Sequence, residues 1–393
     1  MNKILELAQK YELDTANFLA DIAKIPSLSG QEKGVVDRIS KEMKKVGFDE
    51  VRVDGLGSVI GRIGNGPVKI AFDAHIDTVD VGSRALWSFD PYNAHIKDGK
   101  VWGRGVADQK GGMASMVYAG KIIKELGLVK NATIYMVGSV MEEDCDGLCW
   151  DYLIRKENLR PDICVLTEPT SLNIYRGHRG RMEIKIKHKG LSCHGSAPER
   201  GDNAVYKMSK LVLDIEQLNA RLKTDDFLGK GTVAVTEFKS VSPSLCAVPD
   251  ESEIHLDRRL TWGETEESAI QEICKLATAS GARVFVPTYE GKGYTGLIHP
   301  MKKYFPTWKI PTEHKGVVSA VNGYKKLFDR EPQVDKWTFS TNGVAIMGIH
   351  NIPCIGFGPG HEPQAHAPDE WTPVDHLSKA SAFYAQFVEE MAV

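Results

Sequence analysis

The stretch Asp73-Ala74-His75-Ile76-Asp77-Thr78-Val79 decides the fold of this 393-residue chain. The apolar residues 68–72 lead into it and predict a buried strand. Because strand side chains alternate, His75 and Asp77 can face the same side, at the strand end where open α/β sheets bind ligands. One ring nitrogen of His75 could hold a metal while Asp77 fixes its tautomer through the other. Taken alone, the pair is weak evidence, and a surface histidine beside a turn aspartate is the favoured alternative.

The bulk composition limits the classes of partner. The formal net charge is only −3, which argues against nucleic acid or an acidic membrane surface as a partner. No apolar run is long enough to span a bilayer, and the N-terminus lacks the apolar core of a secretion signal. The seven cysteines are scattered and form no C-x-x-C pair. We therefore predict a cytoplasmic, reducing location.

Carboxylates follow further apolar strands along the chain. Strand 132–139 runs into Glu142 and Glu143, and strand 163–167 ends at Glu168. Asp108 follows a glycine-rich stretch and precedes a helix predicted over residues 111–126. Each has an ordinary alternative, a helix N-cap for Asp108 and a solvated charge run for the glutamates. Their repetition after several strands favours one shared site.

The pattern changes at about residue 180. Residues 181–189 alternate between apolar and charged, which predicts a strand with one wet face. Strands and helices then follow in the order strand, helix, strand, strand, helix, strand, as in a ferredoxin-like α+β unit. We predict an α/β domain formed by residues 1–179 and 295–393, with residues 180–294 inserted as a second domain. We also predict single helices over residues 2–24 and 264–279 and a long loop over residues 81–100.

The polar residues at the strand ends form a set with a definite chemistry. They are His75, Asp77, Asp108, Glu142, Glu143, Glu168 and, near the C-terminus, His366. Two histidines and several carboxylates suit a pair of zinc-like ions that share one carboxylate and a bridging water. A carboxylate outside the ligand set can take the proton of that water. The set predicts metal-assisted hydrolysis, with a regulatory or structural metal site as the alternative.

Five motifs in this order resemble those of the M20 metallopeptidases. They are Ala74-His75-Ile76-Asp77-Thr78-Val79, Gly103-Arg104-Gly105-Val106-Ala107-Asp108, Glu142-Glu143, Thr167-Glu168-Pro169 and Ala365-His366-Ala367-Pro368-Asp369-Glu370. That family includes carboxypeptidases, acetylornithine deacetylase, succinyl-diaminopimelate desuccinylase and aminoacylases. Within it, the chain resembles most a branch of hydrolases named for a link to selenium metabolism. The resemblance implies a two-domain fold, in which a mixed sheet covered by helices on both faces forms the catalytic domain.

The resemblance also assigns roles to these residues. Asp108 would bridge two divalent ions, zinc in the first place, with cobalt or manganese as alternatives. His75 and Glu168 would hold one ion, and Glu143 and His366 the other. Asp77 would orient His75. Glu142 would be the general base that activates the bridging water.

In this family the inserted domain mediates dimerisation. The resemblance therefore implies a homodimer in which His194 reaches the partner's site and stabilises the oxyanion. Arg259 would grip a substrate carboxylate, as the guanidinium geometry favours. Asn342 and Thr341 lie where the family's substrate-binding loop lies. The alternative for His194, a thiol hydrolase built on neighbouring Cys193, is disfavoured because the metal set already explains the histidine.

Three positions bear on substrate and geometry. Gln109 follows the bridging aspartate where many members carry an acidic residue, and the resemblance implies a cis peptide between them. Ala74 replaces a common glycine and leaves the ligands intact. Glu168, rather than aspartate, resembles the carboxypeptidase and deacylase side. We expect a hydrolase of an N-acyl amino acid or small peptide with a free carboxylate. Hydrolysis of a carbamoyl or ureido amide and a non-catalytic metal-binding homologue remain the alternatives.

Overall fold

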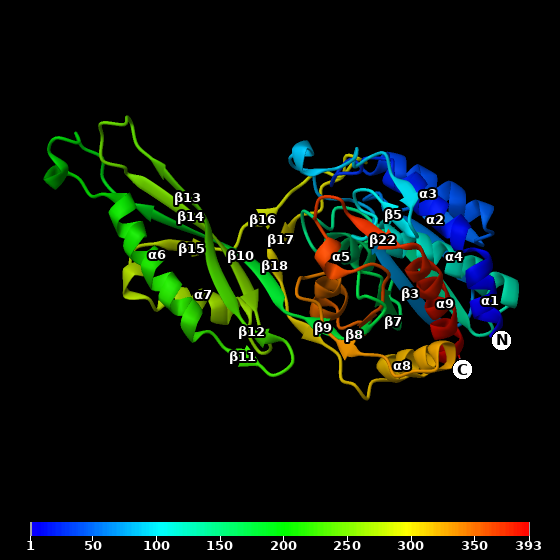
Figure 1. Ribbon diagram of the computed structural model, residues 1–393. Coiled ribbons are helices and arrows are strands. Elements are labelled where there is room, and N and C mark those ends of the chain that lie inside the picture. The colour runs from blue at the N-terminus through cyan, green and yellow to red at the C-terminus, as the bar shows by residue number, and fades with distance from the viewer. Residues whose placement is uncertain (1, 393) are drawn as a thin grey trace.

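The computed structural model describes residues 2–392 and shows two bodies that lie side by side (Figure 1). The larger body contains both chain ends and is built on an eight-stranded mixed sheet. The smaller body is built on a five-stranded antiparallel sheet. Each body has its own hydrophobic core, and the second core is formed mainly by residues 182–286. The α/β fold with an inserted ferredoxin-like domain, predicted from the sequence, is thereby confirmed.

The large sheet has the strand order β1-β2-β6-β3-β7-β21-β8-β20. Its strands are β1 (Glu50–Val53), β2 (Val59–Gly64), β3 (Val68–His75), β6 (Ala132–Ser139), β7 (Ile163–Leu166), β8 (Ile174–Tyr175), β20 (Val334–Asp335) and β21 (Cys354–Gly356). The central strand β3 pairs in parallel with β6 and β7, so the carboxyl ends of the three strands meet at one edge. Strands β1 and β2 are antiparallel and close one side of the sheet.

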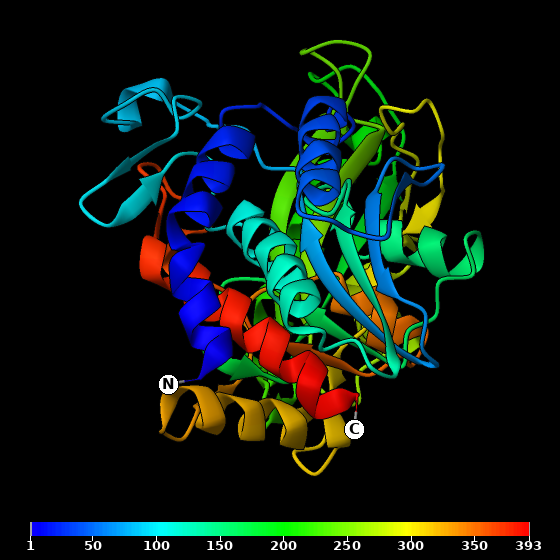
Figure 2. The same cartoon turned by 90° about the vertical axis from the view of Figure 1, so that its right-hand side faces the viewer.

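Helices cover both faces of this sheet. They are α1 (Lys3–Lys10), α2 (Glu12–Ala23), α3 (Lys33–Lys45), α4 (Lys110–Leu126), α5 (Leu148–Arg155), α8 (Lys315–Phe328) and α9 (Val374–Met391). Helices α1, α2, α4 and α9 form one layer, which lies in front of the sheet in Figure 2. Helix α5 packs with the short π-helix η4 (Val344–Ile349) on the other side. None of the helices of residues 2–392 combines the length and the apolar character needed to cross a bilayer.

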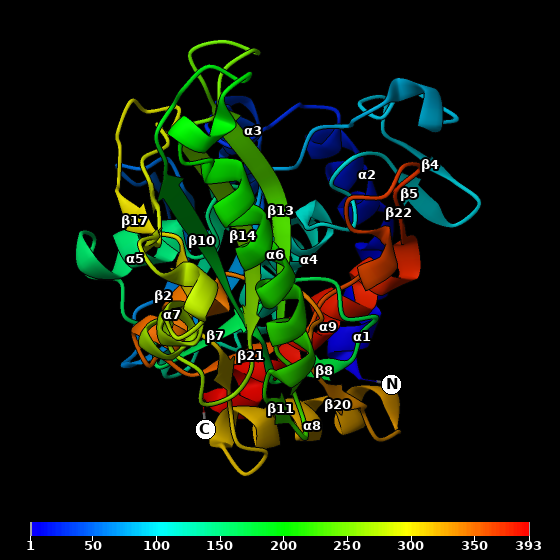
Figure 3. The same ribbon diagram turned by 90° about the vertical axis from the view of Figure 1, so that its left-hand side faces the viewer.

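The inserted body has the strand order β13-β14-β10-β15, with β18 also paired to β10. Its elements are β10 (Gly180–Lys189), α6 (Ala204–Arg221), β13 (Thr232–Val241), β14 (Glu251–Leu260), α7 (Glu266–Cys274), β15 (Arg283–Phe285) and β18 (Tyr304–Phe305). Both helices cover one face of the sheet (Figure 3). Along β10, Met182, Ile184 and Ile186 are buried while the residues between them are partly exposed, as the alternating pattern predicts.

Short strands complete the fold. They are β4 (His95–Lys97), β5 (Lys100–Trp102), β9 (Gly177–His178), β11 (Thr224–Asp225), β12 (Gly229–Lys230), β16 (Thr288–Tyr289), β17 (Met301–Lys302), β19 (Trp308–Lys309) and β22 (Trp371–Pro373). Strands β4, β5 and β22 form a small sheet. Strand β4 and the first residue of β5 lie within residues 81–100, which were predicted as a loop. The loop prediction was wrong. The Asp98-Gly99 turn between β4 and β5 is a local hairpin signal that it overlooked, whereas the pairing of β5 with β22, about 270 residues later, has no local signal.

Two predicted helices are shorter than expected. The helix predicted over residues 2–24 is broken at Tyr11, which leaves the helical region and whose hydroxyl donates to Glu125 over 2.6 Å. The helix predicted over residues 264–279 ends as α7 at Cys274 and is followed by a 3₁₀ turn. Apolar spacing continues through both breaks, so periodicity alone could not place them.

Candidate metal centre and substrate pocket

The predicted site residues meet at the edge where β3, β6 and β7 end. His75 is the last residue of β3, Glu142 and Glu143 follow β6, and Glu168 follows β7. Parallel pairing brings these three strand ends side by side. His75, Glu142 and Glu168 are all buried. The strand order of the sheet therefore brings these polar side chains together at one edge.

Five of these residues form two groups that share Asp108. His75, Asp108 and Glu168 make one group, and Asp108, Glu143 and His366 make the other. In each group, one ligand atom per residue lies within 4.8 Å of the others. Oδ1 of Asp108 lies 2.9 Å from Nε2 of His75, while its Oδ2 lies 3.3 Å from Nε2 of His366. We call these five residues the ligand cluster.

Asp77 lies directly behind the ligand cluster. Its carboxylate accepts the backbone N–H groups of Glu142 and Glu143 at 3.2 and 3.1 Å. Its own carbonyl oxygen accepts from Nδ1 of His75 at 3.0 Å, whereas its carboxylate lies 3.6 Å from that nitrogen. Asp77 therefore contacts the ring nitrogen of His75 that faces away from Asp108. The backbone carbonyl is the nearer of its two groups.

Burial and mutual repulsion shape the protonation of the cluster. Burial raises the pKa of Glu142 and of Glu168 well above their usual range, and neighbouring carboxylates add to the shift. Hydrogen bonds to Asp108 and Glu143 raise the pKa of His366 to about 10. Burial opposes the charge on Asp108, but His366 and His75 hold its pKa below the ordinary value. The two histidines of the site thus supply too little positive charge to balance the carboxylates of Asp108, Glu142, Glu143 and Glu168.

Divalent cations fit this arrangement. Imidazole nitrogens and carboxylate oxygens are the ligands that zinc and similar ions take in proteins. Oε2 of Glu168 is buried and has no hydrogen-bond partner in the described part of the chain, so it is free for an ion. Glu142 belongs to neither group, although its Oε2 lies 4.0 Å from Nε2 of His75. Glu142 therefore lies beside the ligand cluster but is not one of its candidate ligands.

Glu370 holds the loop that carries Asp108. Its fully buried carboxylate accepts the backbone N–H groups of Gly105, Ala107 and Asp108 at 2.7–3.1 Å. Nη1 of Arg104 donates to it at 2.8 Å. Sequence reasoning included Arg104 and Glu370 in its motifs but assigned neither a role. The peptide bond between Asp108 and Gln109 is cis, as the resemblance implied.

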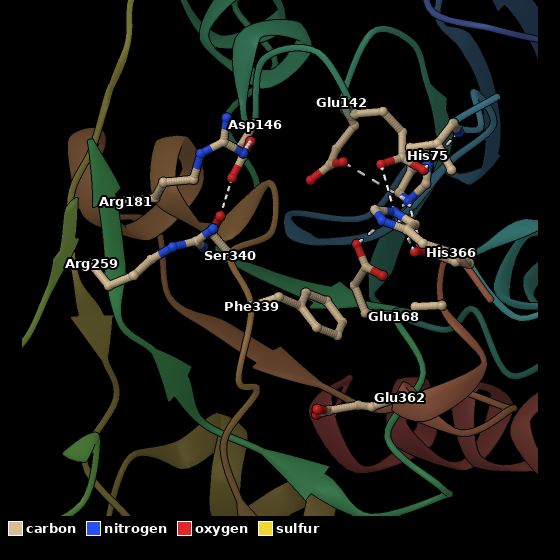
Figure 4. Close-up of a pocket in the computed structure, with 14 residues that line it drawn as sticks. His75, Glu142, Asp146, Glu168, Arg181, Arg259, Phe339, Ser340, Glu362 and His366 are labelled. Carbon is tan, nitrogen blue, oxygen red and sulfur yellow. Dashed lines mark hydrogen bonds and ion pairs between the residues drawn. The ribbon is translucent and has the colours of Figure 1, made fainter. Parts of the chain in front are cut away.

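A pocket of about 370 Å³ opens in front of the ligand cluster (Figure 4). Glu142, Glu168 and His366 line one side of it, and Arg181 and Arg259 line the opposite side. The two arginines are cross-strand neighbours on β10 and β14, and we call them the arginine pair. Nη1 of Arg181 lies 3.1 Å from Asp146, which also accepts from Ser340, and Arg259 binds Asp257 at 2.7 Å. The sequence predicted Arg259 here but missed Arg181.

Two predicted substrate-binding residues lie away from this pocket. Asn342 is buried, and its amide donates to Asp73 and Ser139 at 2.8 and 3.0 Å. Thr341 is buried against His178. Their neighbours Phe339 and Ser340 line the pocket instead.

His194 is exposed in the loop after β10, where its Nδ1 accepts from the backbone N–H of Ser196 at 3.1 Å. Arg181 lies at the first end of β10 and the His194 loop follows its last end, so the ten-residue strand separates them by roughly 30 Å. Within one chain, His194 is therefore remote from the ligand cluster.

Comparison with known proteins places this site in a family. The model of peptidase family M20/M25/M40 matches residues 71–390, which span both bodies. This chain belongs to the M20 family. It is 54% identical over 384 residues to the uncharacterised protein YgeY of Escherichia coli K12, covering 97% of this chain and 95% of that protein. It is 27% identical to a probable succinyl-diaminopimelate desuccinylase of Staphylococcus epidermidis, covering 92% and 93% of the two chains.

Solved structures share the fold. The aminopeptidase PepT of Bacillus cereus superposes with a TM-score of 0.74 at 21% identity, covering 97% of this chain and 99% of that one. As an M20 member, the chain is a metallohydrolase of the peptidase and deacylase type, which acts on amide bonds. The family is metal-dependent, and the ligand cluster supplies candidate ligands in this chain.

Proposed function

We propose that this protein is a dinuclear-metal hydrolase that cleaves an amide bond in a small substrate with a free carboxylate. The observation that carries the proposal is the sharing of Asp108 between two ligand groups, with one of its oxygens toward His75 and the other toward His366. Its substrate would be an N-acyl amino acid or a small peptide.

The ligand cluster would hold two divalent ions, for which zinc is the first candidate. His75 and Glu168 would bind one ion, Glu143 and His366 the other, and Asp108 both. Bound there, the ions would polarise the substrate carbonyl and lower the pKa of a water molecule in the pocket. The buried, unpartnered oxygen of Glu168 and the crowding of carboxylates support this assignment.

Glu142 would act as the general base. It lines the pocket, lies next to the ligand cluster and belongs to neither ligand group. Its carboxylate would take a proton from water in the pocket and return it to the leaving nitrogen, and burial, which raises its pKa, favours the uptake of that proton. Asp77 would support it by holding the backbone of Glu142 and the ring of His75.

Arg259 would bind the substrate carboxylate. It faces the ligand cluster across the pocket from the inserted body (Figure 4). Thr341 and Asn342 would act indirectly, because they hold the segment that places Phe339 and Ser340 in the pocket wall.

His194 would complete the site of a second subunit in a homodimer formed through the inserted body. Its exposed position far from its own pocket supports this arrangement. Exposed apolar residues of the same body, Tyr206 and Leu213 on α6 and Phe238 on the edge strand β13, supply a surface for the contact.

Amine release from a panel of substrates tests the proposal. The panel holds N-acetyl and N-succinyl amino acids, dipeptides and N-carbamoyl amino acids, each given to the Zn²⁺- or Mn²⁺-loaded protein with and without chelator. Chelator-sensitive turnover of an acyl or peptide substrate supports the proposal. Turnover of the carbamoyl substrates alone would replace it with ureido hydrolysis. Silence of the metal-loaded protein across the panel would contradict it in favour of a non-catalytic homologue.

A further inference from the structure

A short turn near the N-terminus contacts the site from behind. Residues 27–32, which we call the N-terminal turn, precede the region matched by the family model. The hydroxyl of Ser27 donates to the carbonyl oxygen of Ile76 at 2.8 Å, and the backbone N–H of Thr78 donates back to Ser27 at 2.9 Å. The hydroxyl of Ser29 donates to Asp77 at 2.6 Å. The turn is thus joined to the segment that carries His75 and Asp77.

Glu32 ends this turn with a fully buried carboxylate. Its Oε1 accepts two backbone N–H groups, that of Gly30 at 2.9 Å and that of Met141 at 3.1 Å. Met141 has a φ of 61°, in the left-handed region that is costly for a side chain of its size. It immediately precedes Glu142. A distant acidic residue therefore holds the backbone at the point where the chain turns toward the proposed base.

Glu32 and Asp77 together bind three consecutive backbone N–H groups. Glu32 takes that of Met141, and Asp77 takes those of Glu142 and Glu143. Buried N–H groups need partners, so this tight turn is satisfied by carboxylates rather than by a sheet or helix.

The segment that returns from the inserted body packs against the same turn. A Cβ added at Gly30, whose φ is 79°, would lie 2.9 Å from the carbonyl oxygen of Lys292. A Cβ added at Gly293 would lie 3.4 Å from the sulfur of Met141. The turn before Glu142 is therefore enclosed by the N-terminal turn on one side and by the returning segment on the other.

We infer that Glu32 is a positioning residue for the proposed base. It fixes Met141 in the left-handed conformation and so directs the side chain of Glu142 into the pocket. The inference rests on the proposed function, because it assumes that Glu142 is the base. It adds a residue from outside the matched family region to the machinery of the site.

Hydrogen exchange and kinetics of Glu32 variants test this inference. In Glu32→Ala, the backbone N–H of Met141 loses its buried acceptor, while those of Glu142 and Glu143 keep Asp77. We expect exchange in this segment of the metal-loaded protein to become at least roughly tenfold faster, as loss of a hydrogen bond to a charged group implies. For any panel substrate that is turned over, kcat should fall roughly 10–100-fold with KM little changed, since the base is misplaced and the arginine pair is not.

Glu32→Gln is the conservative variant. An amide of the same length keeps an acceptor oxygen at the position of Oε1, so it is the closest mimic of the wild-type side chain. Its oxygen can accept the same two N–H groups, and both exchange and kcat should stay within about twofold of wild type. If Glu32→Ala does not fold, Glu32→Asp takes its place, since a side chain one methylene shorter should give the same changes in weaker form.

Asp54→Ala is the matched control. Asp54 is also buried and also accepts two backbone N–H groups, those of Gly57 and Ser58 at 2.6 and 2.8 Å, but in the loop after β1. It should leave exchange at residues 141–143 unchanged. Wild-type exchange and kcat in Glu32→Ala would overturn the inference, as would equal damage in Glu32→Gln or in Asp54→Ala. If instead Glu142→Gln retains activity, the proposed function fails, while the exchange result stands by itself.

Discussion

The ligand cluster and the arginine pair face each other across one pocket, yet they are held in opposite ways. The cluster sits where three strands of the central sheet end, and buried carboxylates hold its backbone. The arginine pair sits on a sheet with a separate core, and each guanidinium is engaged by a carboxylate, Asp146 or Asp257. Under the proposed function, a substrate carboxylate would compete with those partners, whereas a cation would meet the unpartnered oxygen of Glu168. The proposed function therefore assigns the reaction chemistry to the ligand cluster and the substrate selectivity to the arginine pair, whose carboxylate partners a substrate can replace.

The strongest test of this division is Glu142→Gln. Removing a base that is not a ligand should lower kcat by roughly 10²–10⁴-fold while both metal ions stay bound. Elemental analysis and steady-state kinetics on the same preparation check this. Loss of metal together with activity would place Glu142 among the ligands and break the comparison.

A pH series tests the junction between the two sides. His178 is fully buried, donates from Nδ1 to a carbonyl oxygen and accepts at Nε2 from Trp308 at 2.8 Å and from the backbone N–H of Thr341 at 3.1 Å. Burial lowers its pKa from 6.5 to about 4. The unfolded chain therefore binds the extra proton first, and the free energy of unfolding should fall by up to about 3 kcal/mol as pH drops from 6.5 to 4.

Urea denaturation of wild type and His178→Gln across this range measures the contribution. Metal release affects both proteins alike, so the difference between their slopes isolates this histidine. The variant should lose less stability on acidification than the wild type. Parallel curves would show that His178 takes up its proton as readily in the folded protein as in the unfolded chain.

Arg259→Ala tests the role of the arginine pair. It should raise KM roughly tenfold or more for a substrate with a free carboxylate, because a charge-assisted bidentate contact is lost. A substrate whose carboxylate is converted to an amide should bind both proteins equally. Arg283→Ala, an exposed arginine on β15 of the same sheet, is the control and should change neither constant. A fall in kcat at constant KM would show instead that Arg259 acts in the chemical step and not in substrate binding.

Subunit mixing gives the smallest signal. His194→Ala and Glu142→Ala, each inactive alone, should recover about a quarter of wild-type activity when mixed and reassociated, since half the dimers then carry one intact site. Mass spectrometry of the intact assemblies verifies that heterodimers have formed. No recovery in proven heterodimers would place the action of His194 within its own subunit or outside the reaction.

How much of the site could be predicted depends on whether a local pattern marks it. His75 and Glu168 stand where apolar strands end, and alternation with strand order brings them together. Arg181 appeared only as one charged residue of an alternating strand. Its place beside Arg259 follows from the register between β10 and β14, which alternation does not determine.

Residues that act over long sequence distances were missed. Glu370 binds backbone more than 260 residues earlier, and Glu32 binds backbone 109 residues later. Such buried carboxylates carry no periodicity, because their partners are N–H groups of loops. Asn342 shows the reverse case. Its position in the family's substrate-binding loop predicted substrate contact, but its amide donates hydrogen bonds to Asp73 and Ser139 inside the core.

Two connections between the bodies pair with each other, as β9 runs antiparallel to β19. The chain passes between the bodies through this short two-stranded ribbon, in which Nε1 of Trp308 donates to His178 at 2.8 Å. It passes between them again through the returning segment at Lys292 and Gly293, which packs against the N-terminal turn and Met141. Any displacement of the inserted body would therefore strain two links at once. Since one of them encloses the turn before Glu142, the position of the inserted body and the placement of the proposed base are mechanically joined.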